Sequence, residues 1–216
     1  MKNKKSIVIS LCLILLSVFY TILVKCVDVA FVNGSKVGFS SINKAVSNCL
    51  GFNSSLYKIS EVLGYIALLV VLCYGLYGLF LLIKRKSLFK VDREILLLGL
   101  LFVVTLCVYI FFEKCIINYR PVLIDGVLEA SYPSSHTVLA LCVFGGVLIV
   151  NKSLFKDKKW FKYFNIFLVV MMISTVLFRF ISGAHWFTDI LGGLLISGTL
   201  LYMFYSLVNC GKTYEK

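Results

Sequence analysis

Long apolar stretches alternate with shorter polar segments along almost the whole chain. Six stretches approach the length of about 20 helical residues that crossing a hydrocarbon layer requires. They lie at residues 6–25, 60–83, 95–112, 136–151, 163–181 and 188–209. The fourth is short and can gain length from residues 131–135. The pattern therefore predicts an all-α protein, a polytopic bundle of six transmembrane helices.

The composition agrees with a membrane protein. Of the 216 residues, 60% are hydrophobic and 15% are charged, and the mean hydropathy of +0.96 is too high for a soluble domain of this length. Residues 27–57 form the one long polar connection, where we expect a short amphipathic element. No small-residue cleavage site follows the first stretch, so we expect an uncleaved anchor. With no repeat or low-complexity tract, we expect one membrane domain over residues 1–216.

The basic residues gather in alternate connections, which predicts an orientation. Fifteen of the 22 lysines and arginines precede the first stretch, lie between stretches two and three or four and five, or follow the sixth. These residues are Lys2, Lys4, Lys5, Lys84, Arg85, Lys86, Lys90, Arg93, Lys152, Lys156, Lys158, Lys159, Lys162, Lys212 and Lys216. Because short loops rich in Lys and Arg stay in the cytoplasm, both termini are predicted to be cytoplasmic. This topology explains the net charge of +12, and no nucleic-acid partner is implied.

The eight cysteines show no CxxC pair, and most fall in apolar stretches, where cysteine behaves as a small apolar residue. Cys26, Cys49 and Cys115 are predicted on the outer side, away from the basic loops. A disulfide is possible among these three, but their spacing indicates no pairing.

The residue types that are rare in this chain gather at the outer ends of the predicted helices. The chain has two histidines, two prolines and four arginines. Both histidines, both prolines and two arginines lie at the outer ends of stretches three to six: Arg120, Pro121, Pro133, His136, Arg179 and His185. Because 18 lysines supply the ordinary positive charge, Arg120 and Arg179 indicate planar, bidentate binding of an oxyanion.

The chemistry of this group of residues favours phosphate. Lys114 and the two arginines would form a clamp of three cations, and residues 133–136 begin a helix whose first amides add anion donors. His185 lies one turn before Asp189, the arrangement of a histidine held in one tautomer for use as a nucleophile or base. His136 can then give a proton to the leaving oxygen. No Cys/His/Asp cluster has metal-ligand spacing and no Gly-rich phosphate loop is present, so neither a metal nor a nucleotide cofactor is predicted.

Each residue also has a purely structural interpretation. Arg120-Pro121 can end a helix and extend to the interface, His136 can be satisfied by water, and His185 with Asp189 can form a hydrogen bond at a helix start. Ionisable residues near a membrane are functional mainly when they face the bundle interior. Four separate segments bring these residues to one depth, which favours a site between facing helices.

Together these residues resemble the signature of the type 2 phosphatidic acid phosphatase superfamily. That signature reads Lys, six residues, Arg-Pro; then Pro-Ser-Gly-His; then Ser-Arg, five residues, His, three residues, Asp. The corresponding segments here are Lys114-x5-Arg120-Pro121, Pro133-Ser134-Ser135-His136 and Phe178-Arg179-x5-His185-x3-Asp189. Three parts in the right order are far more specific than one short motif. The resemblance covers residues 95–209, which we expect to be the catalytic core.

Three positions depart from the signature. Phe178 replaces a serine, and Ser135 replaces a glycine while keeping its backbone N–H. Lys114 lies six residues before Arg120 instead of seven, and Glu113 takes the position of the family's lysine. On a regular helix this shift rotates the side chain by roughly 100°, so Lys114 reaches the site only if the helix unwinds before Pro121.

The resemblance implies a metal-independent lipid phosphatase of the outer face that acts on a lipid phosphate or a prenyl diphosphate such as undecaprenyl diphosphate. It implies that His185 attacks phosphorus to form a phosphohistidine, that Asp189 orients His185 and that His136 protonates the leaving group. The phosphate-binding residues it implies are Arg120, Arg179, Lys114, Ser134 and Ser135. Two alternatives stay open: a phosphotransferase, and a non-catalytic protein that binds or transports lipid phosphates. An oriented nucleophile and an acid favour an enzyme over the binding protein.

Overall fold

The computed structural model describes residues 2–32, 34–155 and 159–210 of the chain. Within them, six helices are long and apolar enough to cross a membrane. They are α1 (Lys2–Cys26), α3 (Ser54–Arg85), α4 (Arg93–Lys114), a continuous helix over residues 135–154, α7 (Lys159–Ile181) and α8 (Phe187–Cys210). The continuous helix consists of α5 (Ser135–Ala140), a π-helical turn (Leu141–Gly145) and α6 (Gly146–Leu154). The predicted six-helix membrane fold is confirmed.

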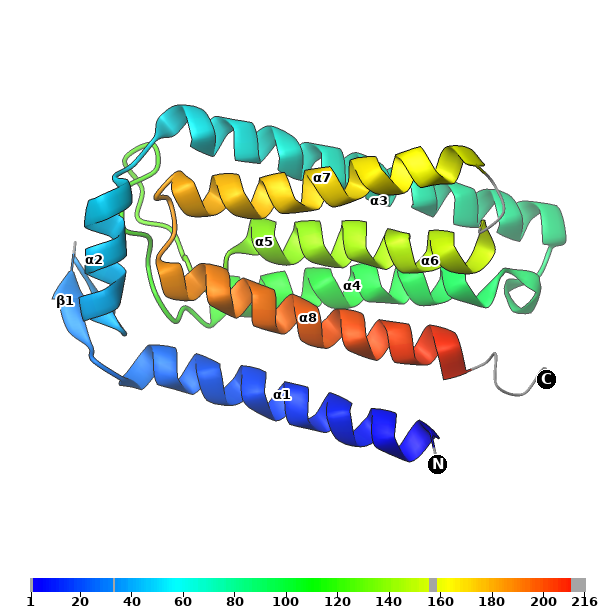
Figure 1. Ribbon diagram of the computed structural model, residues 1–216, viewed down its shortest axis with the longest axis horizontal. Coiled ribbons are helices and arrows are strands. Elements are labelled where there is room, and N and C mark those ends of the chain that lie inside the picture. The colour runs from blue at the N-terminus through cyan, green and yellow to red at the C-terminus, as the bar shows by residue number, and fades with distance from the viewer. Residues whose placement is uncertain (1, 33, 156–158, 211–216) are drawn as a thin grey trace.

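The two ends of the bundle differ in what they carry. Figure 1 shows the start of α1, the end of α8 and the connection between α3 and α4 at one end. That connection holds a short 3₁₀ helix, Leu88–Lys90. Together with the helix ends on either side of it, the connection carries five of the basic residues that predict the orientation. Four others, Lys156, Lys158, Lys212 and Lys216, lie outside the described residues. The starts of α3, α5 and α8 lie at the opposite end.

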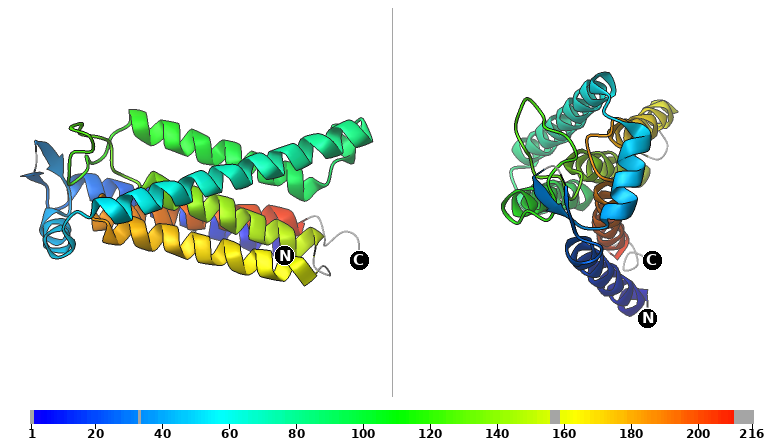
Figure 2. Two further views of the ribbon diagram at one scale, coloured as in Figure 1. Left: turned by 90° about the horizontal axis from the view of Figure 1, so that it is seen from above. Right: turned by 90° about the vertical axis from the view of Figure 1, so that its left-hand side faces the viewer.

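The polar connection predicted at residues 27–57 covers this opposite end. It forms a hairpin of β1 (Ala30–Val32) and β2 (Ser35–Val37), with Ala30 opposite Val37, and then α2 (Ser40–Leu50). Helix α2 lies across the end of the bundle (Figure 2) and corresponds to the short amphipathic element that we expected. The hairpin was not predicted, because strands of three residues are too short to show an alternating pattern.

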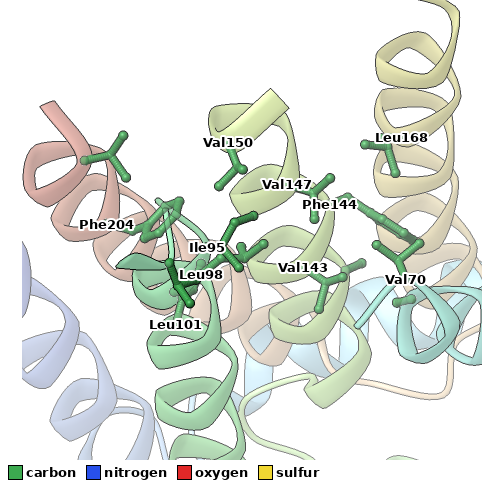
Figure 3. Packing of buried hydrophobic residues seen from close by; sticks show 14 of the residues in the cluster. Val70, Ile95, Leu98, Leu101, Val143, Phe144, Val147, Val150, Leu168 and Phe204 are labelled. Atoms are coloured by element: carbon green, nitrogen blue, oxygen red, sulfur yellow. The ribbon is translucent and has the colours of Figure 1, made fainter. Parts of the chain in front are cut away.

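The helix over residues 135–154 lies at the centre of the bundle, where it is the most buried of the six spans. Figure 3 shows Val143, Phe144 and Val147 of this helix packed between the side chains of α3, α4, α7 and α8. Two glycines allow the close approach: a Cβ on Gly145 would lie 2.8 Å from Leu201, and one on Gly146 would lie 2.7 Å from Leu101. Small residues at helix crossings are typical of membrane bundles, because van der Waals packing supplies much of their association.

Many large apolar side chains point away from the bundle, as they do in a protein surrounded by lipid. Helix α1 shows this most clearly, because it packs mainly against α8 and leaves its other faces exposed. Its hydroxyl groups bond to neighbours, Ser17 to Thr199 at 2.9 Å and Thr21 to Tyr132 at 2.8 Å. In the part of the chain that the structure describes, Cys26, Cys49 and Cys115 form none of the disulfides considered from the sequence.

Candidate active site

The rare residues identified in the sequence meet at the end of the bundle that α2 covers. His136 lies in the first turn of α5, Arg179 in the last turn of α7 and Asp189 in the first turn of α8. His185 lies in the tight turn between α7 and α8, where Gly183 takes a φ of +66° that residues with a side chain rarely adopt. A Cβ on Gly183 would also lie 1.9 Å from the Gly51 carbonyl oxygen, so the turn fits closely against the chain that leaves α2.

His185 is connected to Asp189 through Ser131. The Nδ1 atom of His185 lies 3.1 Å from both the hydroxyl and the carbonyl oxygen of Ser131, but 3.9 Å from the Asp189 carboxylate. The Ser131 hydroxyl donates its hydrogen to Asp189 Oδ2. Its oxygen can therefore only accept, and so Nδ1 carries the hydrogen of the His185 ring. The lone pair of the neutral ring is then on Nε2.

Asp189 is fixed by further donors. The Trp186 amide donates to its Oδ2 at 3.0 Å, and the Asn118 side chain donates to its Oδ1 at 3.5 Å. The Ser134 amide donates to the Asp189 carbonyl oxygen at 3.0 Å, which ties the start of α5 to the start of α8. A buried carboxylate with several donors is a rigid support for the groups that it contacts.

The environment of His185 keeps its ring neutral. The side chain is almost fully buried. This burial, together with the nearby charges of Arg120 and Arg179, holds the pKa of His185 well below its usual range. At neutral pH the Nε2 lone pair is therefore available, as a nucleophilic imidazole requires.

The two arginines are buried with free donors. Arg179 is 0% exposed and Arg120 is 7% exposed. The Nε and Nη1 atoms of both arginines, as well as His185 Nε2, have no hydrogen-bond partner among the described residues. Tyr57 supports both guanidinium groups, with its ring centroid 4.7 Å from Arg179 Cζ and 5.9 Å from Arg120 Cζ. Unpaired buried donors of this kind are suited to the oxygens of a phosphoryl group.

His136 contacts both Arg179 and Glu61. Its Nδ1 accepts a hydrogen bond from Arg179 Nη2, and its Nε2 lies 3.4 Å from Oε1 of Glu61 on α3. The same Glu61 oxygen accepts a hydrogen bond from Arg179 Nη2. Glu129, from the segment between α4 and α5, pairs with Arg120 at 3.2 Å. Each of the two arginines therefore has a carboxylate partner as well as free donors.

The remaining predicted site residues are placed as follows. Ser134 is fully buried at the N-terminal cap of α5, with its hydroxyl bonded to Thr137 at 3.0 Å, and Ser135 is half-buried in the first turn. Lys114 ends α4 with an exposed side chain. Glu113, its neighbour, lines the cavity described below, whereas Lys114 does not. The structure therefore brings together all the predicted residues except Lys114.

A cavity of about 550 Å³ extends from the two histidines between α3, α4 and α5. Its polar end holds Glu61, Ser131, Ser135, His136 and His185. The rest of its lining is mainly apolar, with Leu68, Phe102, Leu106, Phe112, Leu139 and Val143 among its residues. A reactive end joined to an apolar groove is suited to a molecule with a polar head and a hydrocarbon tail.

Four of the residues that hold this site together, Ser131, Asn118, Tyr57 and Glu61, were not predicted from the sequence. Ser131 and Asn118 lie in the polar segment before α5, where nothing distinguishes them from ordinary loop residues. Tyr57 and Glu61 lie on α3, far from the motifs in sequence. Glu61 did carry a signal, because a lone acidic residue inside an apolar span is a candidate functional residue by default.

Comparison with known proteins agrees with the motifs and the fold. Residues 107–210 match the family model described as the PAP2 superfamily. A comparison with curated protein sequences finds no match. The structure is similar to a crystal structure of a Bacillus subtilis protein described as the first transmembrane PAP2 type phosphatidylglycerolphosphate phosphatase. The TM-score is 0.64 and the sequence identity is 20%. The similarity covers 94% of this chain and 96% of that one.

These findings confirm the predicted resemblance. The protein is a multi-pass membrane protein with the fold of a transmembrane PAP2 phosphatase, and its region 107–210 carries the PAP2 superfamily pattern. The family match supports a phosphatase. Among residues 2–32, 34–155 and 159–210, no group of three or more His, Cys, Asp or Glu side chains is arranged to hold a metal ion.

Proposed function

We propose that this protein is a membrane lipid phosphatase that removes a phosphoryl group through a phosphohistidine on His185. One observation carries the proposal. His185 lines one end of an apolar cavity, and its Nε2 atom is buried with no hydrogen-bond partner among the described residues. Four guanidinium nitrogens of the neighbouring Arg120 and Arg179 are buried and unpaired in the same way. This set combines a neutral nucleophile with donors for the charged oxygens of a phosphoryl group.

The reaction follows from the roles of these atoms. Nε2 of His185 attacks phosphorus, while the bond from phosphorus to the leaving oxygen breaks and its electron pair stays on that oxygen. His136 gives the leaving oxygen a proton, and a water molecule then hydrolyses the phosphohistidine with His136 as the base. Arg120 and Arg179 hold the phosphoryl oxygens throughout, and the first amides of α5, around Ser135, add donors.

Ser134 and Lys114 were predicted to bind phosphate, but we propose no such role for either side chain. Ser134 is given a structural role at the start of α5, because its fully buried hydroxyl accepts a hydrogen bond from the Thr137 hydroxyl. Lys114 is left out, since its side chain is exposed at the end of α4 and Glu113 takes the place on the cavity wall. The two arginines and the amides of α5 would therefore carry the binding of the phosphate.

The substrate class is supported by the cavity and by the fold. The cavity is mainly apolar beyond its reactive end and can hold part of a hydrocarbon chain. The matched Bacillus subtilis protein is titled a phosphatidylglycerolphosphate phosphatase. We therefore propose a lipid phosphate monoester as the substrate, with a prenyl diphosphate such as undecaprenyl diphosphate as the alternative.

We place the site on the extracytoplasmic face. The basic connection between α3 and α4 lies at the end of the bundle opposite to the site, and basic loops stay in the cytoplasm. Cys49 on α2 is exposed at the site end and is available as a native probe. A membrane-impermeant maleimide should label Cys49 in intact cells, and Cys49→Ser should lose that adduct. Labelling of Cys49 only after permeabilisation would place the site in the cytoplasm.

The activity is tested by incubating the detergent-purified protein in EDTA with phosphatidic acid, phosphatidylglycerophosphate and undecaprenyl diphosphate, and measuring released phosphate. We expect release from at least one of these lipids, unchanged by EDTA and absent in the His185→Gln variant. Loss of release in EDTA would refute a metal-independent reaction. Transfer of the phosphoryl group to an added alcohol without release would indicate a phosphotransferase, and binding of lipid without either reaction would indicate a binding protein.

A further inference from the structure

Glu61 contacts both the acid and an arginine of the proposed site from a helix that the family pattern does not cover. It lies on α3, whereas the match to the PAP2 superfamily begins at residue 107. It is the only acidic residue of α3. Its Oε1 atom accepts a hydrogen bond from Arg179 and lies 3.4 Å from His136 Nε2. Among the described residues, no other carboxylate forms an ion pair with His136.

The shape of α3 holds the His136 ring against this carboxylate. Gly64 lies three residues after Glu61, on the same face of the helix. A Cβ on Gly64 would lie 2.6 Å from His136 Cδ2 and 2.7 Å from its Nε2, so the ring packs directly against the backbone of α3. The ring therefore packs against Gly64, while its Nδ1 contacts Arg179 and its Nε2 contacts Glu61.

The hydrogen positions on His136 follow from its neighbours. Arg179 can only donate, so the Nδ1 atom that it contacts is an acceptor in the neutral ring. The hydrogen of the neutral ring is then on Nε2, the nitrogen nearest to Glu61. Protonation adds a positive charge beside Arg179, which Coulomb repulsion opposes and a contacting carboxylate offsets. An acid at this position therefore needs a carboxylate such as Glu61.

We propose that Glu61 is a positioning residue for the acid, so that the site contains two histidine–carboxylate pairs: His185 with Asp189 for attack, and His136 with Glu61 for protonation of the leaving oxygen. This inference rests on the proposed function. In the first half-reaction, the electron pair of the breaking bond takes the His136 proton, which leaves an alcohol, a neutral His136 and phosphohistidine at His185. In the second half-reaction, His136 takes a proton from the attacking water and its charge is again balanced by Glu61.

A purely structural role makes a different prediction. If Glu61 only neutralised Arg179, its loss would weaken binding of every phosphate ester to a similar extent. If Glu61 supports the acid, its loss slows those substrates whose leaving oxygen needs a proton and spares those whose leaving group departs without one. The identity of the leaving group therefore separates the two roles.

The experiment uses two amphiphilic phosphate monoesters with the same hydrocarbon chain, one an alkyl phosphate and the other a nitrophenyl phosphate. Glu61→Gln should lower kcat for the alkyl phosphate by about 100-fold, since general acid catalysis contributes about 10²- to 10⁴-fold. For the nitrophenyl phosphate we expect a change of less than about threefold, because nitrophenolate leaves without a proton. His136→Gln should show the same selective loss, and the double variant should lose no more than His136→Gln alone.

Glu94→Gln is the matched control, because Glu94 lies at the other end of α4, where it accepts a hydrogen bond from Ser153. It should leave both rates unchanged. Equal losses on the two substrates, or no loss on either, would overturn the role of Glu61. If Glu61→Gln elutes as an aggregate, Glu61→Asp retains the charge for Arg179 but shortens the reach to His136, and it should show the same selectivity in weaker form. An inactive wild-type protein would instead refute the proposed function.

Discussion

The two parts of the chain contribute different kinds of group to the site. The region matched by the family model, residues 107–210, supplies every side-chain atom that is buried without a hydrogen-bond partner among the described residues: Nε and Nη1 of Arg120 and Arg179, and Nε2 of His185. The part before residue 107 supplies Tyr57, Glu61 and Gly64, which contact these arginines or His136. The matched region thus presents the unpaired groups and also holds them through Ser131 and Asp189, and the part before residue 107 adds a second set of supports.

The same division applies outside the reactive groups. Asn43 of α2 donates to the Gly38 carbonyl oxygen at 2.8 Å and to the Thr188 hydroxyl at 2.9 Å, and it accepts from the Thr188 amide at 3.2 Å. These bonds fix Thr188 at the start of α8, directly before Asp189. Asn43 is thus a further support that comes from the part of the chain before residue 107.

Replacing an arginine tests the part that presents donors. Arg179→Lys keeps the charge but removes the planar set of donors, so we expect kcat/KM for the lipid substrate to fall by about 100-fold, as it does when one donor of an oxyanion site is lost. Arg85→Lys is the matched control, because Arg85 forms a two-point pair with Asp92 at the other end of the bundle. Equal activities of the two variants would contradict the phosphate-binding role.

Ser131→Ala tests the link between His185 and Asp189. The variant loses the hydroxyl that connects them, so the ring is held less firmly in the tautomer that frees Nε2. We expect kcat to fall by about 10- to 100-fold, because a hydrogen bond to a charged group is worth about 1.5–3 kcal/mol and each 1.4 kcal/mol is tenfold in rate. Ser197→Ala, which removes a buried hydroxyl from the middle of α8, should stay near wild type. A fully active Ser131→Ala would show that His185 does not need this link.

Gly64→Ala tests the supporting part by shape alone. The added methyl group would overlap the His136 ring, and overpacking of this kind costs about 1–3 kcal/mol. We expect a lower Tm and a loss of up to about tenfold in kcat for an alkyl phosphate. Gly75→Ala on the same helix is the control, since nothing lies within 4 Å of its added methyl group. Identical behaviour of the two variants would mean that α3 does not confine His136.

The smallest expected effect is that the His185 ring does not gain a proton near pH 6.5 in the folded protein. His185 has its pKa lowered by burial, so in the folded protein it stays neutral well below pH 6.5, whereas in the unfolded chain it gains a proton near that value. Stability from this group is therefore present above pH 6.5 and declines as the pH falls toward the pKa of the folded state. In His136→Gln the one remaining imidazole is His185, so histidine-labelled NMR spectra between pH 7.5 and about 5.5 should show an unchanged neutral ring. A midpoint near 6.5 would contradict a buried neutral nucleophile.

The sequence was enough to predict the six membrane helices and most of the reactive groups. A long apolar stretch in a membrane is expected to form a spanning helix, because a helix satisfies all its backbone hydrogen bonds internally. Rare residue types such as the two histidines and Arg120 stood out against a background of lysine. Ser131 could not be found in this way, because a serine in a loop is ordinary and only its distances to His185 and Asp189 reveal its role. Lys114 was included from the motif, but the structure places its side chain on the exposed end of α4.

The most direct test of the account is to trap the covalent intermediate. Purified protein is mixed with a radiolabelled lipid phosphate monoester, quenched in alkali, and examined for label that survives alkali but is released by acid, as phosphohistidine is. The account predicts such label on the wild-type protein, located by proteolysis in the peptide that contains His185, and no label on His185→Gln. Label on a different residue, or phosphate release by His185→Gln at the wild-type rate, would contradict the central role of His185.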